Sequence, residues 1–254
     1  FRALTVGRTL SRALAGDQAA VSLAGIDAFT LYAGEPDRHT LATRTLAALH
    51  AGLDHPIGGD VAAALDGLGT AAFMAAAGYE PAATYPGVEL GEHLTEVARL
   101  VKADIGLRVA CVDAGGWDMH TNLGTVDDGA MQRELTALGA ALGAFATDLG
   151  DRLDHVTVVV MTEFGRRVEQ NANGGTDHGH GATVLLLGGG LAGGTIHGTW
   201  HGLAPDLLDQ GDVPGWNDYR DLLAEVASAR LGVGAGDMAA VFPGHRVQHL
   251  GVMR

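Results

Sequence analysis

The sequence is poor in cysteine and in positive charge, and both shortages exclude classes of function. Its single cysteine, Cys111, excludes an internal disulfide and a zinc site made of cysteines. Lysine and arginine number 16 against 30 aspartates and glutamates, which gives a formal net charge of −14. Such a charge repels phosphate groups, so we expect neither nucleic acid nor an anionic membrane surface as a partner.

Long apolar runs and the common catalytic motifs are missing too. We find no apolar stretch long enough to cross a bilayer and no signal peptide, so we expect no membrane span. There is no Gly-x-Ser-x-Gly nucleophile elbow, no P-loop and no dinucleotide-binding fingerprint, and residues 188–190 lack the spacing of a glycine-rich phosphate loop. Because the first residue is Phe1 instead of methionine, we expect a processed or incomplete chain.

The chain does contain enough apolar material for a folded core. Its 254 residues are 47% hydrophobic, which is typical of a globular protein. Hydrophobic periodicity predicts helices over residues 1–15, 37–51, 60–77, 90–103, 126–152 and 219–231. Apolar runs predict strands over residues 20–23, 107–113, 156–162, 183–187 and 195–197.

The order of these elements predicts the fold class. Strands and helices alternate in the second half, which predicts an α/β fold with a mainly parallel sheet flanked by helices. We expect a single domain over residues 1–254, with a mostly helical front part at 1–86 and an α/β part at 87–254 that carries the motifs. Only three of the strands are strong, fewer than a buried parallel sheet normally has, and an uncovered apolar edge is unfavourable.

A carboxylate follows one of the apolar runs. Val158–Met161 leads to Glu163, and a loop rich in glycine and asparagine then leads to Asp177 and His178. Ligands bind beyond the carboxyl ends of parallel strands, so these three side chains are expected at one site. Carboxylate and imidazole ligands suit zinc, manganese or iron. The alternatives are an ion pair of Glu163 with a neighbouring arginine, and hydrogen bonding within the loop in which Asp177 orients the histidine.

A second arrangement of this kind follows the strand predicted at 107–113. Two glycines lead to Trp117, Asp118 and His120, so the same metal-binding argument applies to this aspartate and histidine. Asp113, at the end of the strand, is a rival ligand. The alternatives are a capping or surface role for His120, a turn-forming role for Asp113 and a packing role for Trp117.

Other polar residues lie near these motifs. Arg166 follows the strand predicted at 156–162 and is a candidate to bind an anionic group. Asn171 and Asn173, in the loop, either donate hydrogen bonds to substrate oxygens or form turns. An anionic small molecule is therefore an expected substrate.

Three segments, in this order, resemble the signature segments of a bacterial domain-of-unknown-function family: Val112–Asn122, Thr162–Arg167 and Gly174–Gly179. The resemblance extends from about Leu90 to the end of the chain. Members of that family typically carry twin-arginine export signals, and the family is grouped with the alkaline phosphatase and sulfatase superfamily. The resemblance implies an alkaline-phosphatase-like sheet with divalent metal at the carboxyl ends of its strands, and a periplasmic or extracellular location.

The chain departs from the superfamily in two respects. Asp118 and His120 match its first Asp…His pair and His178 matches its late histidine, but Glu163-Phe164 stands where an Asp-His pair is usual, and phenylalanine cannot bind metal. The initial strand, the Gly-rich segment with its aspartate and the serine nucleophile of relatives are not found. The resemblance thus implies a sheet that lacks its N-terminal strand or strands, completed by an N-terminal segment of the same protein or by another chain. The nucleophile stays unassigned.

Two functions follow as expectations. The first is an exported metal-dependent hydrolase acting on a phosphate or sulfate ester. The second is a non-catalytic binding or assembly protein that keeps the fold, which Phe164 and the missing nucleophile favour. In the first, Arg166 and Asn173 contact the substrate. The expected metal ligands are Asp118, His120, Glu163, Asp177 and His178.

Overall fold

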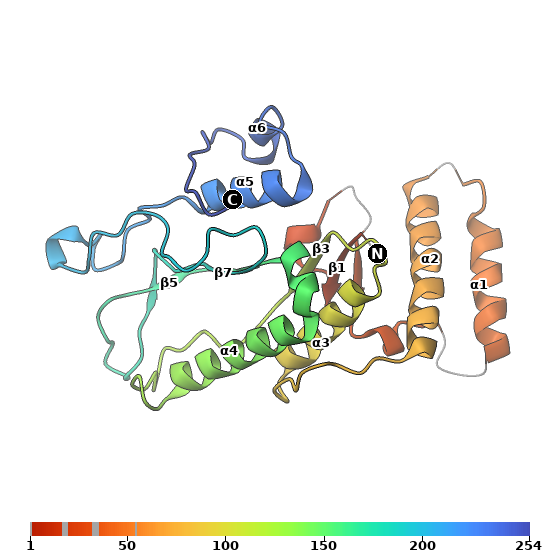
Figure 1. Ribbon diagram of the computed structural model, residues 1–254, viewed down its shortest axis with the longest axis horizontal. Coiled ribbons are helices and arrows are strands. Elements are labelled where there is room, and N and C mark those ends of the chain that lie inside the picture. Colours follow the sequence, from red (N-terminus) through yellow and green to blue (C-terminus); the bar gives the residue numbers. More distant parts are fainter. Residues whose placement is uncertain (1, 17–19, 32–35, 54) are drawn as a thin grey trace. The chain divides into compact units, whose positions relative to one another are not determined.

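The computed structural model describes residues 2–16, 20–31, 36–53 and 55–254 (Figure 1). The chain divides into two compact units, which are described separately. Unit 1 comprises residues 1–115 and 137–149, and unit 2 comprises residues 116–136 and 150–254. Residues 81–87, where the composition suggested a change from the helical front to the α/β part, lie inside unit 1. The single domain stays a prediction.

Unit 1 contains a three-stranded parallel sheet in the order β2-β1-β3. Its strands are β1 (Ala3–Val6), β2 (Val21–Leu23) and β3 (Val109–Val112). The two outer strands confirm the predictions. The helix expected over residues 1–15 is wrong, because these residues form the central strand β1 and the short 3-10 helix η1 (Arg12–Leu14). The sheet thus has two strands before β3, one more than predicted, and the absence of the family's own N-terminal strand or strands stays a prediction.

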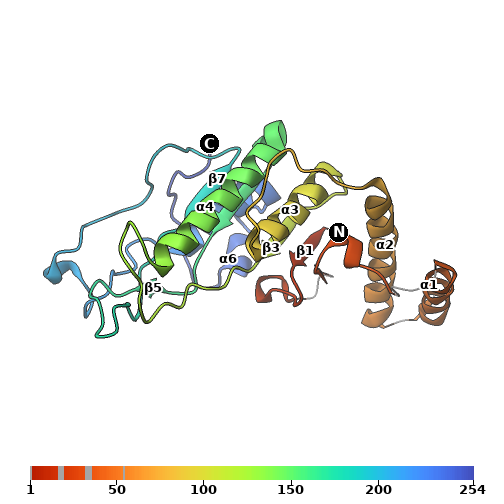
Figure 2. The ribbon, with the colours of Figure 1, turned by 90° about the horizontal axis from the view of Figure 1, so that it is seen from below.

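The helices of unit 1 lie close to the predicted positions. They are α1 (Pro36–His50), α2 (Pro56–Ala77) and α3 (Glu89–Lys102), with the 3-10 helix η2 (Ile26–Ala28) before them. The helix α2 begins earlier than expected, because Pro56 suits the first helical turn and the ring of His55, not Asp60, accepts the hydrogen bond of Ile57 N. The helices α1 and α2 run side by side (Figures 1 and 2).

The helix α2 is unusually apolar. Within it, Ile57–Ala77 is long and apolar enough, by length and composition alone, to cross a membrane, and 22% of its most apolar window is buried. We found no such stretch in the sequence, because glycines and alanines make the run inconspicuous. The absence of a membrane span stays a prediction.

Unit 1 is held together at Asp148, near the end of α4 (Ala130–Leu149). Its fully buried carboxylate accepts hydrogen bonds from Tyr79 Oη at 2.6 Å, Ala82 N at 2.7 Å and Tyr85 Oη at 2.9 Å, and pairs with Lys102 of α3. Burial raises the pKa of this carboxyl group, but these donors outweigh burial and hold the pKa below its ordinary value. The loop before α3, α3 itself and α4 therefore share one anchor.

The strands of unit 2 pair antiparallel. They are β4 (Thr157–Val160) with β7 (Leu185–Gly188), and β5 (Gly165–Arg166) with β6 (His178–Gly179). The two apolar runs are strands, as predicted, but they do not pair in parallel. A parallel return needs a crossover, usually a helix, and residues 161–184 contain none. The strand expected at 195–197 is also wrong, because none of these three residues pairs in a sheet; the bridge in this region joins Leu191 to Met253.

Helices complete unit 2. They are η3 (Gly150–His155), η4 (Pro205–Leu207), α5 (Tyr219–Val226), the π-helical turn η5 (Ala227–Leu231) and α6 (Met238–Val241). The predictions over 126–152 and 219–231 are confirmed, although α4 is shorter at both ends. Glu225 of α5 accepts hydrogen bonds from the backbone N–H groups of Gly251 and Val252, which holds the last residues against α5.

We expect Asp148→Asn to lower the free energy of unfolding by about 3 kcal/mol, because it leaves buried donors and Lys102 without their carboxylate. Urea unfolding followed by circular dichroism measures this change. The control is Asp151→Asn, since Asp151 is exposed. Equal midpoints for the two variants would show that the anchor contributes little.

The same variant predicts a pH dependence. Because the folded pKa of Asp148 is lowered, its contribution is complete above the unfolded pKa of about 3.9 and is lost as the pH falls through the folded pKa. The stability difference between wild type and Asp148→Asn should be constant between about pH 6 and about pH 8 and should shrink below about pH 4. Unfolding curves at each pH test this, and a difference that grows in acid would contradict it.

Candidate metal centre

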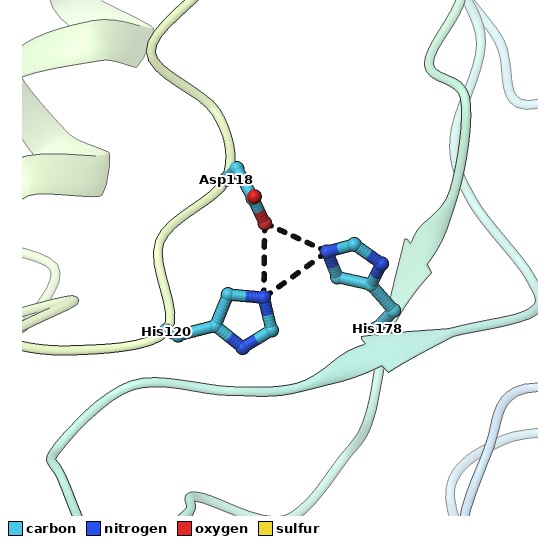
Figure 3. A group of neighbouring side chains, drawn as sticks. All are labelled: Asp118, His120 and His178. Carbon is cyan, nitrogen blue, oxygen red and sulfur yellow. Dashed lines mark hydrogen bonds and ion pairs between the residues drawn. The ribbon is translucent and has the colours of Figure 1, made fainter.

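Two loops of unit 2 bring three potential metal ligands together. Asp118 and His120 come from the loop that precedes α4, and His178 is the first residue of β6 (Figure 3). Oδ1 of Asp118 lies 2.7 Å from Nε2 of His178 and 3.0 Å from Nε2 of His120, and the two Nε2 atoms are 3.2 Å apart. Three donor atoms therefore point at one another from separate parts of the chain.

Backbone pairing aligns the two loops. Thr121 and Gly174 form an antiparallel bridge, and Leu123 N donates to the carbonyl of Gly174 at 2.8 Å. Next to this bridge, a Cβ added at Gly175 would overlap the carbonyl carbon of His120. Glycine is needed at this position because the backbones approach too closely for any side chain.

Arg166 links the same two loops. Its guanidinium donates to the carbonyl oxygens of Trp117 and Thr176, one from each loop, and lies 3.9 Å from Oδ1 of Asp118. The side chain is 19% exposed. Its predicted contact with an anion stays a prediction, and the structure gives it a bracing role.

Phe164 contacts the metal-ligand candidate His178 by ring stacking. The two ring centroids are 3.7 Å apart and the ring planes differ by 11°. The guanidinium of Arg166 lies over the ring of Phe164, 5.0 Å from its centroid. Stacking against Phe164 thus fixes the ring plane of His178.

On the opposite side, Asp177 and Asn171 contact His120. Oδ1 of Asp177 lies 3.0 Å from Nδ1 of His120, the ring nitrogen that faces away from the other donors. Nδ2 of Asn171 donates to this same carboxylate oxygen at 3.1 Å and to the backbone oxygen of His120 at 2.9 Å. Oδ1 of Asn171 accepts from the backbone N–H groups of Asn173 and Gly175, which closes the loop.

The carboxylates of the site are stabilised in their charged form. The hydrogen bond from His178 lowers the pKa of Asp118 below its ordinary value, and the positive charges nearby add to this effect. The hydrogen bonds from His120 and Asn171 likewise lower the pKa of Asp177. The side chains of the three donors are between 43% and 65% exposed, so solutes reach them directly.

The donor set fits a divalent transition metal. Two imidazole nitrogens and one carboxylate oxygen are a usual set for zinc, and leave a position for water or substrate. Tetrahedral ligands at zinc distances are about 3.3 Å apart, close to the observed separations of 2.7–3.2 Å. Among the residues that the structure describes, this is the one group of three or more facing His, Cys, Asp or Glu donors.

The other expected ligands lie outside this group. Asp177 contacts His120 instead of facing the shared point, and Glu163 is exposed and is not among the three facing donors. Their roles as ligands stay predictions, as does substrate binding by Asn173. We did not predict the stacking role of Phe164 or the bridging role of Asn171; the closeness of both to the motifs was the one signal available.

The comparisons with known proteins agree with the motifs. The family model described as "Protein of unknown function (DUF1501)" matches residues 70–234, which include all three donors. The chain belongs to this family. No curated protein and no solved structure matches the chain. In this DUF1501 protein the donor group lies in the part that the family shares.

We expect Arg166→Lys to loosen both site loops, because an ammonium group cannot donate in two fixed directions to Trp117 O and Thr176 O as a planar guanidinium does. Hydrogen exchange read by mass spectrometry should become at least about tenfold faster at residues 116–122 and 174–178. The matched control is Arg167→Lys, since Arg167 contacts Asp212 instead. Equal exchange in both variants would contradict the bracing role.

Proposed function

We propose that this DUF1501 protein is an exported metal-dependent hydrolase that acts on a phosphate or sulfate ester. The observation that carries the proposal is the triangle of Asp118, His120 and His178. Two imidazoles and a carboxylate from two braced loops leave one face of a metal ion free for a substrate oxygen. The ligands are these three residues, Asp177 contacts His120 beside them, and Glu163 stays a further candidate ligand.

A divalent metal held there would polarise the ester and stabilise the charge that develops on its oxygens. The chain's own residues supply the rest. Asp118 and the histidines hold the ion, and Arg166 adds positive charge at 3.9 Å from the same carboxylate. Its guanidinium is already engaged by two carbonyls, so it acts on an anionic substrate through its charge more than through new hydrogen bonds.

We also propose an alkaline-phosphatase-like fold and a location outside the cytoplasm. The parallel sheet of unit 1 and the order of the motifs support an alkaline-phosphatase-like architecture, and the family resemblance supports export to the periplasm or beyond. No nucleic acid is proposed as a partner, because the net charge is −14.

A specific observation favours the second candidate, a binding or assembly protein without catalysis. Phe164 stacks on His178, and by the superfamily resemblance it stands where relatives have a histidine ligand, so a second metal beside the first would lack a ligand there. A single ion would then recognise an anionic group, or fix the loops, without cleaving a bond.

We expect the wild-type chain to bind about one zinc ion and His178→Ala to bind at least about a hundredfold more weakly, since one of three ligands is lost. Competition with a chromogenic chelator measures the affinity. The control is His155→Ala, because His155 is exposed and outside the group. Wild-type protein that binds no zinc, manganese or iron would contradict the metal centre.

Hydrolysis of nitrophenyl phosphate and nitrophenyl sulfate separates the two candidates. The hydrolase proposal predicts turnover that requires the metal and disappears in His178→Ala but persists in His155→Ala. Metal binding without turnover of either ester would favour the binding protein.

A further inference from the structure

Asp177 and Asn171 occupy the side of His120 that faces away from the other donors. Nδ1 of His120 is 3.0 Å from Asp177, whereas Nε2 of the same ring is 3.0 Å from Asp118 and 3.2 Å from His178. The two ring nitrogens therefore have separate partners. A metal bound through Nε2 leaves Nδ1 as an N–H donor, and the carboxylate of Asp177 is placed to accept it.

Asn171 holds the carboxylate of Asp177 in place by a hydrogen bond. One amide group of Asn171 donates both to Oδ1 of Asp177 and to the backbone oxygen of His120. The amide oxygen accepts from the N–H groups of Asn173 and Gly175 in its own loop. The donors and the acceptor of the Asn171 side chain are thereby all used. The distance between the carboxylate of Asp177 and the backbone of His120 is fixed as a result.

We propose that Asp177 and Asn171 are positioning residues that orient His120 toward the metal and do not touch the metal themselves. The inference rests on the proposed metal centre and refines it, since Asp177 was also a candidate ligand. An imidazole held by a carboxylate keeps one tautomer and is a better ligand than a free ring. The loop of residues 171–177 thus orients His120, a ligand that comes from the loop before α4.

The first test replaces zinc by cobalt, whose visible absorption reports the ligands. Asp118→Ala removes a ligand and should change the spectrum of the cobalt-loaded protein. Asp177→Ala should keep the wild-type spectrum and a stoichiometry of about one, while the affinity for zinc falls about 10- to 100-fold. Asn171→Ala should weaken binding in the same direction, because Asp177 then loses its support.

The second test reads the hydrogen bond itself. In zinc-loaded wild-type protein, nitrogen-15 NMR should show a slowly exchanging Nδ1–H signal of His120, assigned by its loss in His120→Gln. Asp177→Ala should abolish this signal and Asp177→Glu should restore it in part. Circular dichroism melting of each variant shows whether it is folded, and any variant that is unfolded without zinc is tested in the zinc-loaded state.

Each outcome decides between roles. A changed cobalt spectrum in Asp177→Ala would mean that Asp177 is a ligand, and unchanged zinc affinity would mean that it only shapes the loop; either result overturns the inference. Failure of the metal centre itself looks different, because wild-type protein would then bind neither zinc nor cobalt.

Discussion

Candidate metal ligands from two loops can meet only when the backbones of the loops are fixed against each other, and Arg166 does this together with the bridge between Thr121 and Gly174. The guanidinium of Arg166 donates to Trp117 O and Thr176 O, so one planar group sets the spacing of both loops. The two carbonyls are far apart in sequence, and holding them costs the conformational entropy of the loops. Asp118 directly follows Trp117 and His178 lies two residues after Thr176, so this contact helps to set the geometry of both donors.

Glycine makes the approach possible. A Cβ at Gly175 would overlap the backbone of His120, and a Cβ at Gly179 would overlap that of Arg166. Glycine is therefore required at these two positions because another backbone lies too close for a side chain. Phe164 and Asn171 then complete the arrangement by fixing the ring plane of one histidine and the backbone of the other.

Features set by local periodicity could be predicted from the sequence, and those set by distant pairing could not. The apolar stripe of α3 and the strand at 157–160 follow from their residues alone. Leu4, Leu10 and Leu14 have helix-like spacing, yet Leu4 lies in a strand because Val21 and Ala110 pair with it. An apolar run also does not show in which direction its strand pairs, so the sequence led us to expect β4 and β7 in a parallel sheet, whereas they pair antiparallel.

The same distinction holds at the site. Asp118, His120 and His178 were predictable because aspartate and histidine beside glycines favour metal binding. The contact of Asp177 with His120 was not predictable, because the two residues are far apart in the sequence, whereas His178 is the direct neighbour of Asp177. Spacing indicates which residues reach a site, whereas only the fold shows which atom of each residue faces it.

Exposure finally bears on what the site can do. The side chain of Asp118 is 65% exposed, and charges open to water stabilise a transition state far less than charges in a dry site. Under the proposed hydrolase function, a small ester would leave the donors hydrated and would react slowly. Under the same function, a substrate with a bulky group beside its ester would itself exclude water from the open face and would react faster than a small ester.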